Sequence, residues 1–112
     1  MSRSDILITP SDRGGTFEAQ PGDEIVIRLQ ENITTGYQWE IAEIDPSVVE
    51  LVDTEYLEAP TPGAIGYGGT RTFRFRAAAR GHARIQLRLR RSWEATDAAI
   101  ERFEVSVHVQ GQ

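Results

Sequence analysis

Hydrophobic and polar residues alternate with a period of two along most of this chain. Between residues 83 and 90 every second residue is apolar, and the residues between them are arginine or glutamine. The same alternation recurs in residues 24–30, 72–76 and 103–109. Successive side chains of a β-strand point to opposite faces, so this pattern is typical of antiparallel strands that bury one face.

The pattern predicts seven strands, separated by turns rich in proline, glycine and aspartate. They are Ile6–Ile8, Glu24–Gln30, Gln38–Ile44, Val48–Tyr56, Thr70–Ala77, Gly81–Arg91 and Glu101–Val109. Seven short strands favour an all-β, immunoglobulin-like antiparallel β-sandwich over a helical bundle. Residues 94–102 could instead form one or two helical turns, although their apolar positions are too sparse to predict a packed helix.

Composition narrows the possible functions. A chain of 112 residues is expected to form one domain, residues 1–112, with a core of its own. The absence of cysteine excludes disulfides, cysteine nucleophiles and cysteine-ligated zinc. A net charge of −5 argues against a general nucleic-acid binder. We find no nucleophile–base set, carboxylate pair or metal triad, and therefore expect no enzyme, no catalytic residue, no metal and no cofactor.

The distribution of apolar residues also bears on location. The first residues are polar, no apolar stretch typical of a secretion signal follows, and no run approaches the ~20 apolar residues of a membrane span. We therefore expect a cytoplasmic protein that binds no membrane. The charged outer faces of the later strands lead us to expect a monomer.

Three distinctive runs fall on connections that a sandwich places at one end. When successive strands alternate in direction, the connections after residues 24–30, 48–56 and 81–91 share a pole. Those connections carry the runs 32–37, 66–69 and 91–93, whereas the connections at the other pole are plain turns. We therefore expect a binding surface at one pole.

The first two runs each allow a structural and a functional interpretation. Thr34 and Thr35 can bond the local backbone in a tight turn with Gly36 at positive φ, although a rigid turn that merely links two strands explains them as well. The connection Leu57–Gly69 is long enough to be either functional or disordered. Its glycines lack the lysine and helix of a phosphate loop, and we interpret Gly66–Gly69 as backbone that approaches a partner closely.

The third run contains one of two tryptophans with different expected roles. Trp39 is in phase with Ile41 on a strand and is expected in the core. Trp93 follows Leu89, the last inward residue of its strand, and lies beside Arg91, as is typical of an interface anchor. The alternative is that Trp93 folds back to cap the core.

The remaining charged residues are expected to be structural. His82 and His108 are expected to be solvated and without a partner. The arginines of residues 70–77 and 81–91 are expected to pair with acidic residues on neighbouring strands, and Glu101, Arg102 and Glu104 lie near enough to take part.

Together the three runs resemble those of chagasin-type inhibitors of papain-family cysteine proteases. That family carries Asn-Pro-Thr-Thr-Gly-Tyr, Gly-X-Gly-Gly and Arg-Pro-Trp in this order, in a domain of similar length. The corresponding candidate protease-binding residues, with the neighbouring Ile65, are Asn32, Ile33, Thr34, Thr35, Gly36, Tyr37, Ile65, Gly66, Tyr67, Gly68, Gly69, Arg91, Ser92 and Trp93. Ile33 and Ser92 replace the family's prolines, which is expected to soften two loops and weaken binding by about 1 kcal/mol.

The resemblance implies a reversible, competitive inhibitor of papain-like cysteine proteases. Thr34 and Thr35 would enter the catalytic centre, Ile65 and the Gly66–Gly68 backbone would lie in the unprimed cleft, and Arg91 and Trp93 would pack on the primed side. An immunoglobulin-like adhesion or interaction module, binding protein or carbohydrate through the same pole, is the alternative. The identity of the protease does not follow from the sequence.

Overall fold

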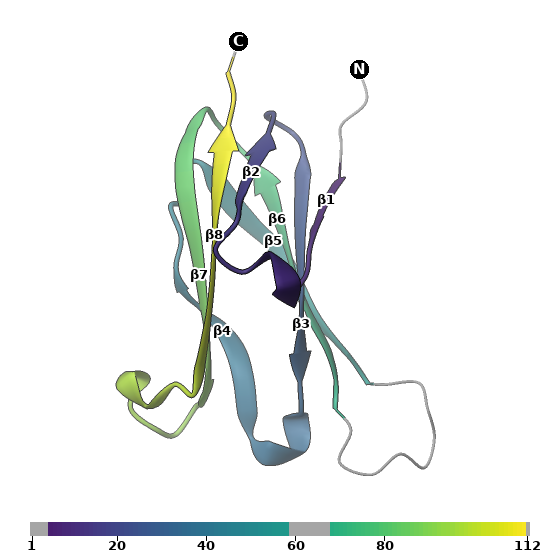
Figure 1. Ribbon diagram of the computed structural model, residues 1–112, viewed down its shortest axis with the longest axis vertical. Coiled ribbons are helices and arrows are strands. Elements are labelled where there is room, and N and C mark those ends of the chain that lie inside the picture. The colour runs from purple at the N-terminus through teal and green to yellow at the C-terminus, as the bar shows by residue number, and fades with distance from the viewer. Residues whose placement is uncertain (1–4, 59–67, 112) are drawn as a thin grey trace.

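The chain folds into two four-stranded sheets that face each other (Figure 1). The computed structural model describes residues 5–58 and 68–111. The prediction of an all-β, two-sheet sandwich is confirmed. The strands of the first sheet are, in order, β1 (Asp5–Ile8), β3 (Glu24–Glu31), β6 (Gly69–Ala77) and β5 (Val49–Glu58). Those of the second are β2 (Thr16–Ala19), β8 (Glu101–Val109), β7 (Gly81–Arg91) and β4 (Tyr37–Glu43).

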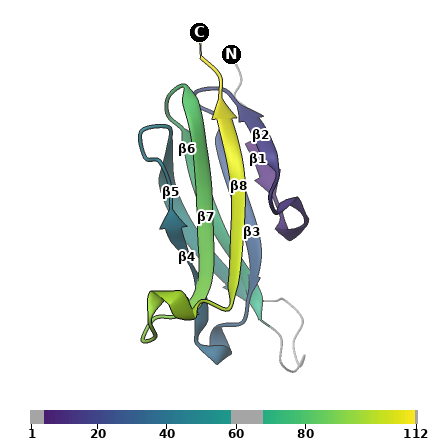
Figure 2. The same cartoon turned by 60° about the vertical axis from the view of Figure 1, so that its left-hand side comes forward.

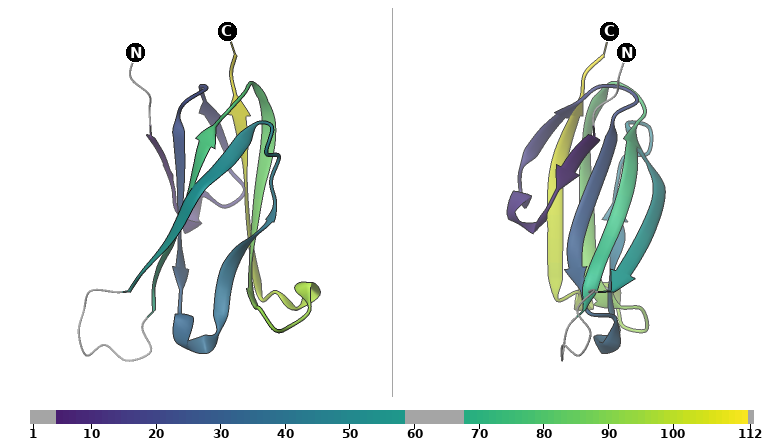
Figure 3. Two further views of the ribbon diagram at one scale, coloured as in Figure 1. Left: turned by 180° about the vertical axis from the view of Figure 1, so that it is seen from behind. Right: turned by 90° about the vertical axis from the view of Figure 1, so that its right-hand side faces the viewer.

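The alternation did not predict the short strand β2. It has four residues, of which only Ala19 is fully buried, so its pattern is too brief to recognise. β1 pairs with β3 in parallel and β2 pairs with β8 in parallel, while all other strand pairs of the described residues are antiparallel. The chain passes from the first sheet to the second through the 3₁₀ turn η1 (Pro10–Asp12), which both views of Figure 3 display.

The core lies between the sheets and consists of the inward positions predicted by the alternation. Trp39 is 6% exposed, which confirms its expected place in the core. Complete burial of a valine, leucine, isoleucine or phenylalanine side chain stabilises a fold by about 1.5–3 kcal/mol. The largest fully buried side chains are Phe75, Phe103, Ile8, Ile25, Ile27, Leu29, Ile85, Leu87, Val49, Val105, Val107 and Val109.

The outer faces carry ion pairs between neighbouring strands, as predicted. Arg74 on β6 pairs with Asp53 and Glu55 on β5, at 3.2 and 3.4 Å. Arg84 on β7 lies 3.4 Å from Glu104 on β8. Such exposed pairs add little stability individually, but they cover the sheets with compensated charge.

The two histidines differ from their prediction. His82 and His108 are directly opposite each other on β7 and β8, and their rings stack with centroids 4.1 Å apart. The Nδ1 atom of His108 also lies 3.6 Å from a carboxylate oxygen of Glu18 on β2. The expectation that both lack a partner is wrong. These contacts depend on the register of β7 against β8 and on the position of β2, which the sequence pattern did not supply.

The predicted clustering of connections at one end is confirmed. The 3₁₀ turn η2 (Ile33–Thr35), the ends of β5 and β6, and the β7–β8 connection lie at the end opposite the carboxyl end of β8 (Figures 1 and 2). We call this end the loop pole. The β7–β8 connection contains one short 3₁₀ turn, η3 (Thr96–Ala98), rather than a packed helix. Within the described residues, no helix has the length and apolarity needed to cross a bilayer.

Candidate functional site

The centre of the loop pole is a closed turn built around Asn32. Its side-chain Oδ1 accepts hydrogen bonds from the backbone N–H of Thr34 (3.1 Å) and from the Thr34 hydroxyl (2.6 Å). The Thr35 hydroxyl donates to the Asn32 carbonyl at 2.7 Å, and the Thr35 N–H donates to the same carbonyl at 3.2 Å. The Thr35 hydroxyl therefore bonds the local backbone, as predicted, whereas the Thr34 hydroxyl bonds the side chain of Asn32. We call residues 32–36 the central turn.

Gly36 ends the central turn and joins it to the neighbouring loop. Its φ of +83° confirms the predicted positive value. A β-carbon at this position would lie 2.6 Å from Cη2 of Trp93, so the indole rests directly on the glycine. Trp93 is nevertheless 70% exposed, which confirms the expected exposed tip and shows that it does not cap the core.

Arg91 holds the central turn and the β7–β8 connection together. Its Nε donates to the carbonyl of Thr35 at 3.1 Å. Its guanidinium carbon lies 4.2 Å from the ring centroid of Tyr37 and 5.9 Å from that of Trp93. Arginine suits this position because its planar cation can stack on aromatic rings while its N–H groups reach a carbonyl. Ser92, the next residue, is exposed beside this cluster.

The second run is described from Gly68 onward, and the predicted contact residues Ile65, Gly66 and Tyr67 lie outside the described residues. A β-carbon on Gly68 would collide with the carbonyl of Glu31 and lie 2.7 Å from Cα of Asn32. A β-carbon on Gly69 would collide with the backbone of β5. For these two glycines, the close backbone approach that we assigned to a partner occurs within the chain itself.

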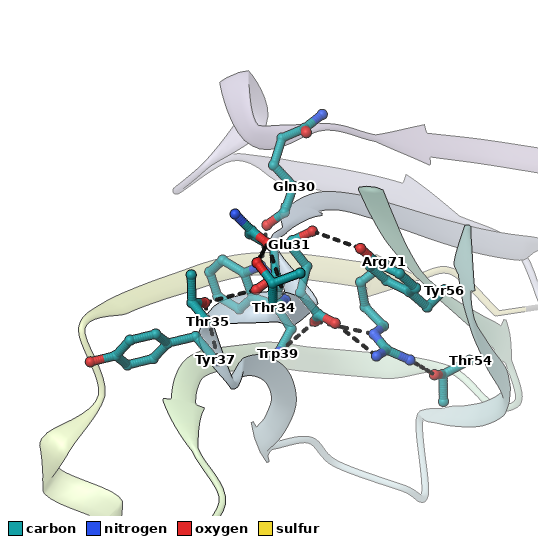
Figure 4. A network of polar contacts seen from close by, with 10 residues as sticks. Gln30, Glu31, Thr34, Thr35, Tyr37, Trp39, Thr54, Tyr56 and Arg71 are labelled. Carbon is teal, nitrogen blue, oxygen red and sulfur yellow. Dashed lines mark hydrogen bonds and ion pairs between the residues drawn. The ribbon is translucent and has the colours of Figure 1, made fainter. Parts of the chain in front are cut away.

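A buried polar network lies behind the central turn (Figure 4). The carboxylate of Glu31 accepts hydrogen bonds from the backbone N–H of Trp39 (2.8 Å) and from Arg71 (2.8 and 3.2 Å). We did not identify Glu31 or Arg71 from the sequence. A signal was present, because each continues the inward-facing series of its strand and the two charges are opposite.

Exposed apolar side chains complete the loop pole. Besides Trp93, Leu57 at the end of β5 is 56% exposed and Ile100 next to β8 is 60% exposed. We did not single out either residue from the sequence. Within residues 5–58 and 68–111, no group of three histidine or acidic side chains is arranged to hold a metal. Hydroxyls, backbone groups and an exposed indole on a rigid support define a binding protein.

Comparison with known proteins identifies the family. A family model described as chagasin family peptidase inhibitor I42 matches residues 18–107. The chain belongs to this family of peptidase inhibitors, which are not enzymes, as the resemblance of the three runs indicated. Chagasin from Trypanosoma cruzi is 28% identical over 102 residues, which cover 88% of this chain and 92% of that protein.

Solved structures support the same fold. The cysteine protease inhibitor EhICP2 from Entamoeba histolytica superposes with a TM-score of 0.88 at 24% identity, covering 98% of this chain and 99% of that one. PbICP-C, solved in complex with falcipain-2, gives a TM-score of 0.63 at 16% identity and covers 98% and 94% of the two chains. The two-sheet sandwich of this chain is thus the fold that these two solved structures share.

Proposed function

We propose that this protein inhibits papain-like cysteine proteases reversibly and competitively by filling the active-site cleft with the loop pole. The observation that carries the proposal is the convergence of the central turn, Gly68 and Trp93 on one rigid pole. Loops held in place before binding lose little conformational entropy on docking. Membership of a peptidase-inhibitor family supports the proposal, and nothing favours the alternative of an adhesion module.

The three parts of the pole are assigned different places in the cleft. Thr34 and Thr35 enter near the catalytic cysteine and histidine, and Ile65 with the Gly66–Gly68 backbone lies in the unprimed cleft. Arg91 and Trp93 pack on the primed side. A standard interface of about 1,600 Å² is within reach of such a pole.

The closed shape of the central turn argues for reversible inhibition. Residues 33–35 form a 3₁₀ turn whose two hydroxyls bond to Asn32. This conformation differs from the extended backbone that pairs with a groove through strand-like hydrogen bonds. The turn therefore presents no peptide bond aligned for attack, and the inhibitor leaves intact when it dissociates.

The missing family prolines are partly offset by this hydrogen bonding. Ile33 and Ser92 leave two loops without the restriction of φ that proline supplies. The bonds to Asn32 close one of these loops, and the contact of Trp93 with Gly36 supports the other. We still predict that the absence of the two prolines weakens binding to the protease by about 1 kcal/mol.

The same proposal includes a monomer that acts in the cytoplasm. Ion pairs across the outer faces of both sheets support the monomer, because they leave compensated charge rather than a broad apolar face. Light scattering of the purified protein tests the monomer, and fractionation of cells that produce it tests the location.

Titration of active papain with this protein, followed with a fluorogenic peptide, tests the function. We expect loss of activity near one equivalent of inhibitor, relieved by excess substrate. Thr35→Ala and Trp93→Ala should each weaken inhibition at least tenfold, whereas Arg84→Gln, on the outer face of β7, should not. Full activity of papain and of a cathepsin-like enzyme in excess wild-type protein would contradict the proposal.

A further inference from the structure

A buried ion pair joins β3 and β6 of the first sheet behind the central turn. The side chain of Glu31 is 0% exposed and that of Arg71 is 16% exposed. Two hydrogen bonds join them, Nη2 to Oε2 at 2.8 Å and Nε to Oε1 at 3.2 Å. Burying two charges costs free energy that their attraction only partly returns, so an apolar pair would stabilise the fold at least as well. We therefore look for the role of this pair in the directed hydrogen bonds that it makes rather than in added stability.

Glu31 closes the base of the central turn. Its Oε1 accepts the backbone N–H of Trp39 at 2.8 Å, and the indole N–H of Trp39 donates to the carbonyl of Gln30 at 2.8 Å (Figure 4). These two bonds join the ends of the segment that carries Thr34 and Thr35. Because Trp39 belongs to β4 in the second sheet, the same bonds fix the distance between the sheets at the loop pole.

Arg71 holds the stems of the neighbouring connection. Its Nη1 donates to the Thr54 hydroxyl on β5 at 3.3 Å, and its guanidinium carbon lies 5.3 Å from the ring centroid of Tyr56. The Tyr56 hydroxyl in turn donates to the carbonyl of Glu31 at 3.3 Å. Arg71 therefore ties β6 to β5 as well as to β3, immediately before these strands reach the connection that ends at Gly68.

We propose that the Glu31–Arg71 pair is a positioning device that sets the central turn relative to the Gly68 end of the neighbouring connection. The inference rests on the proposed function. Neither residue touches the protease; the pair acts through the turn. Arg91 makes the corresponding link on the other side of the turn, through the Thr35 carbonyl. Two arginines thus support one turn from two sides, and their directional hydrogen bonds favour the arrangement in the structure.

Two substitutions separate positioning from folding. Arg71→Gln removes the guanidinium but leaves the Glu31–Trp39 bond. The double variant Glu31→Gln/Arg71→Gln leaves no buried charge without a partner, and its Glu31→Gln change keeps an oxygen that can accept the Trp39 N–H. The matched control is Arg74→Gln, on the same strand β6, which removes the outer-face ion pairs with Asp53 and Glu55 of β5.

The measurements are the inhibition constant and dissociation rate with papain, and amide hydrogen exchange in the free protein. For both variants we expect an inhibition constant at least tenfold higher, mainly through faster dissociation. Exchange should accelerate at Thr34–Gly36 but not in β7 and β8. Arg74→Gln should change the inhibition constant, the dissociation rate and the exchange at Thr34–Gly36 by no more than twofold.

Three results would overturn the inference. They are an inhibition constant within twofold of wild type in both variants, equal acceleration of exchange in β7 and β8, and failure of both variants to fold at low temperature. The last would show that the pair supports the whole sandwich. If the wild-type protein does not inhibit papain, the proposed function fails, and the exchange of Thr34–Gly36 still decides whether the pair positions the turn.

Discussion

Gly36 is the residue at which backbone conformation and loop packing meet most directly. Its φ of +83° suits glycine, and the indole of Trp93 occupies the space that a side chain would need. The position therefore combines two separate restrictions, one on the backbone and one on the neighbouring loop. Gly14 has nearly the same φ, +80°, but nothing lies within 4 Å of where its β-carbon would be.

The two glycines make a matched pair for mutation. We expect Gly36→Ala to lower the free energy of unfolding by about 1–2 kcal/mol and to weaken inhibition of papain at least tenfold, because Trp93 must move. Gly14→Ala should cost about 1 kcal/mol of stability and leave inhibition unchanged. Urea unfolding and inhibition constants measure both effects. Equal inhibition by the two variants would show that the position of Trp93 does not matter.

Among elements, strands with long alternation could be predicted and the short or irregular ones could not. β7 and β8 alternate over most of their length, so hydrophobic burial alone locates them. β2 buries too few side chains to produce a pattern. The parallel pairing of β1 with β3 and of β2 with β8 was also not predictable, because it depends on how the chain crosses between sheets.

The candidate site divides in the same way. The positive φ of Gly36 and the exposed Trp93 follow from local sequence and could be predicted. The Glu31–Arg71 pair requires the register of β3 against β6, in which Leu29 and not Glu31 is directly opposite Arg71. The stack of Arg91 on Tyr37 likewise requires the register of β4 against β7. The sequence pattern therefore indicates that charges pair across strands but leaves out which residues meet.

The β4–β7 pair contains an ion cluster with a predictable pH dependence. Partial burial tends to raise the pKa of Glu40, but hydrogen bonds from Arg90 and Arg88 and the charges of both arginines lower it below its usual value of 4.5. A carboxylate with a lowered pKa in the folded state stabilises the fold above its unfolded pKa. That stabilisation is lost as the pH falls through the lowered value.

Glu40→Gln tests this cluster. We expect wild type to be more stable than the variant at pH 7, and the difference to shrink steadily as the pH falls below 4.5. Urea unfolding across this pH range measures the difference. Glu104→Gln, which removes an exposed pair, should differ little from wild type at either end. A Glu40→Gln difference that is constant with pH would contradict the assignment.

At the scale of the whole molecule, the sandwich separates stability from binding. Fully buried side chains such as Val105 lie between the sheets, whereas Trp93 extends from the loop pole and is 70% exposed. Binding residues on loops over a rigid scaffold are a common arrangement, because such loops can vary without cost to the core. The two regions are therefore expected to respond independently to mutation.

Val105→Ala and Trp93→Ala test this separation. Val105→Ala should cost about 2–3 kcal/mol and lower the unfolding midpoint by about 10 °C, with the inhibition constant unchanged at 25 °C. Trp93→Ala should have the opposite effect, a weakened inhibitor with an unchanged midpoint. Calorimetry and papain titration measure the two quantities. A loss of inhibition by folded Val105→Ala would show that the core and the pole are coupled.

The carboxyl end of β8 lies at the far end of the molecule from η2 and the β7–β8 connection (Figure 1). A tag or a tether attached there points away from the face that meets the protease. Beads that carry the protein through this end are therefore expected to leave the face free for capture. Such a resin would retrieve from a cell extract whichever cysteine protease this inhibitor recognises, and release it on competition with a small substrate analogue.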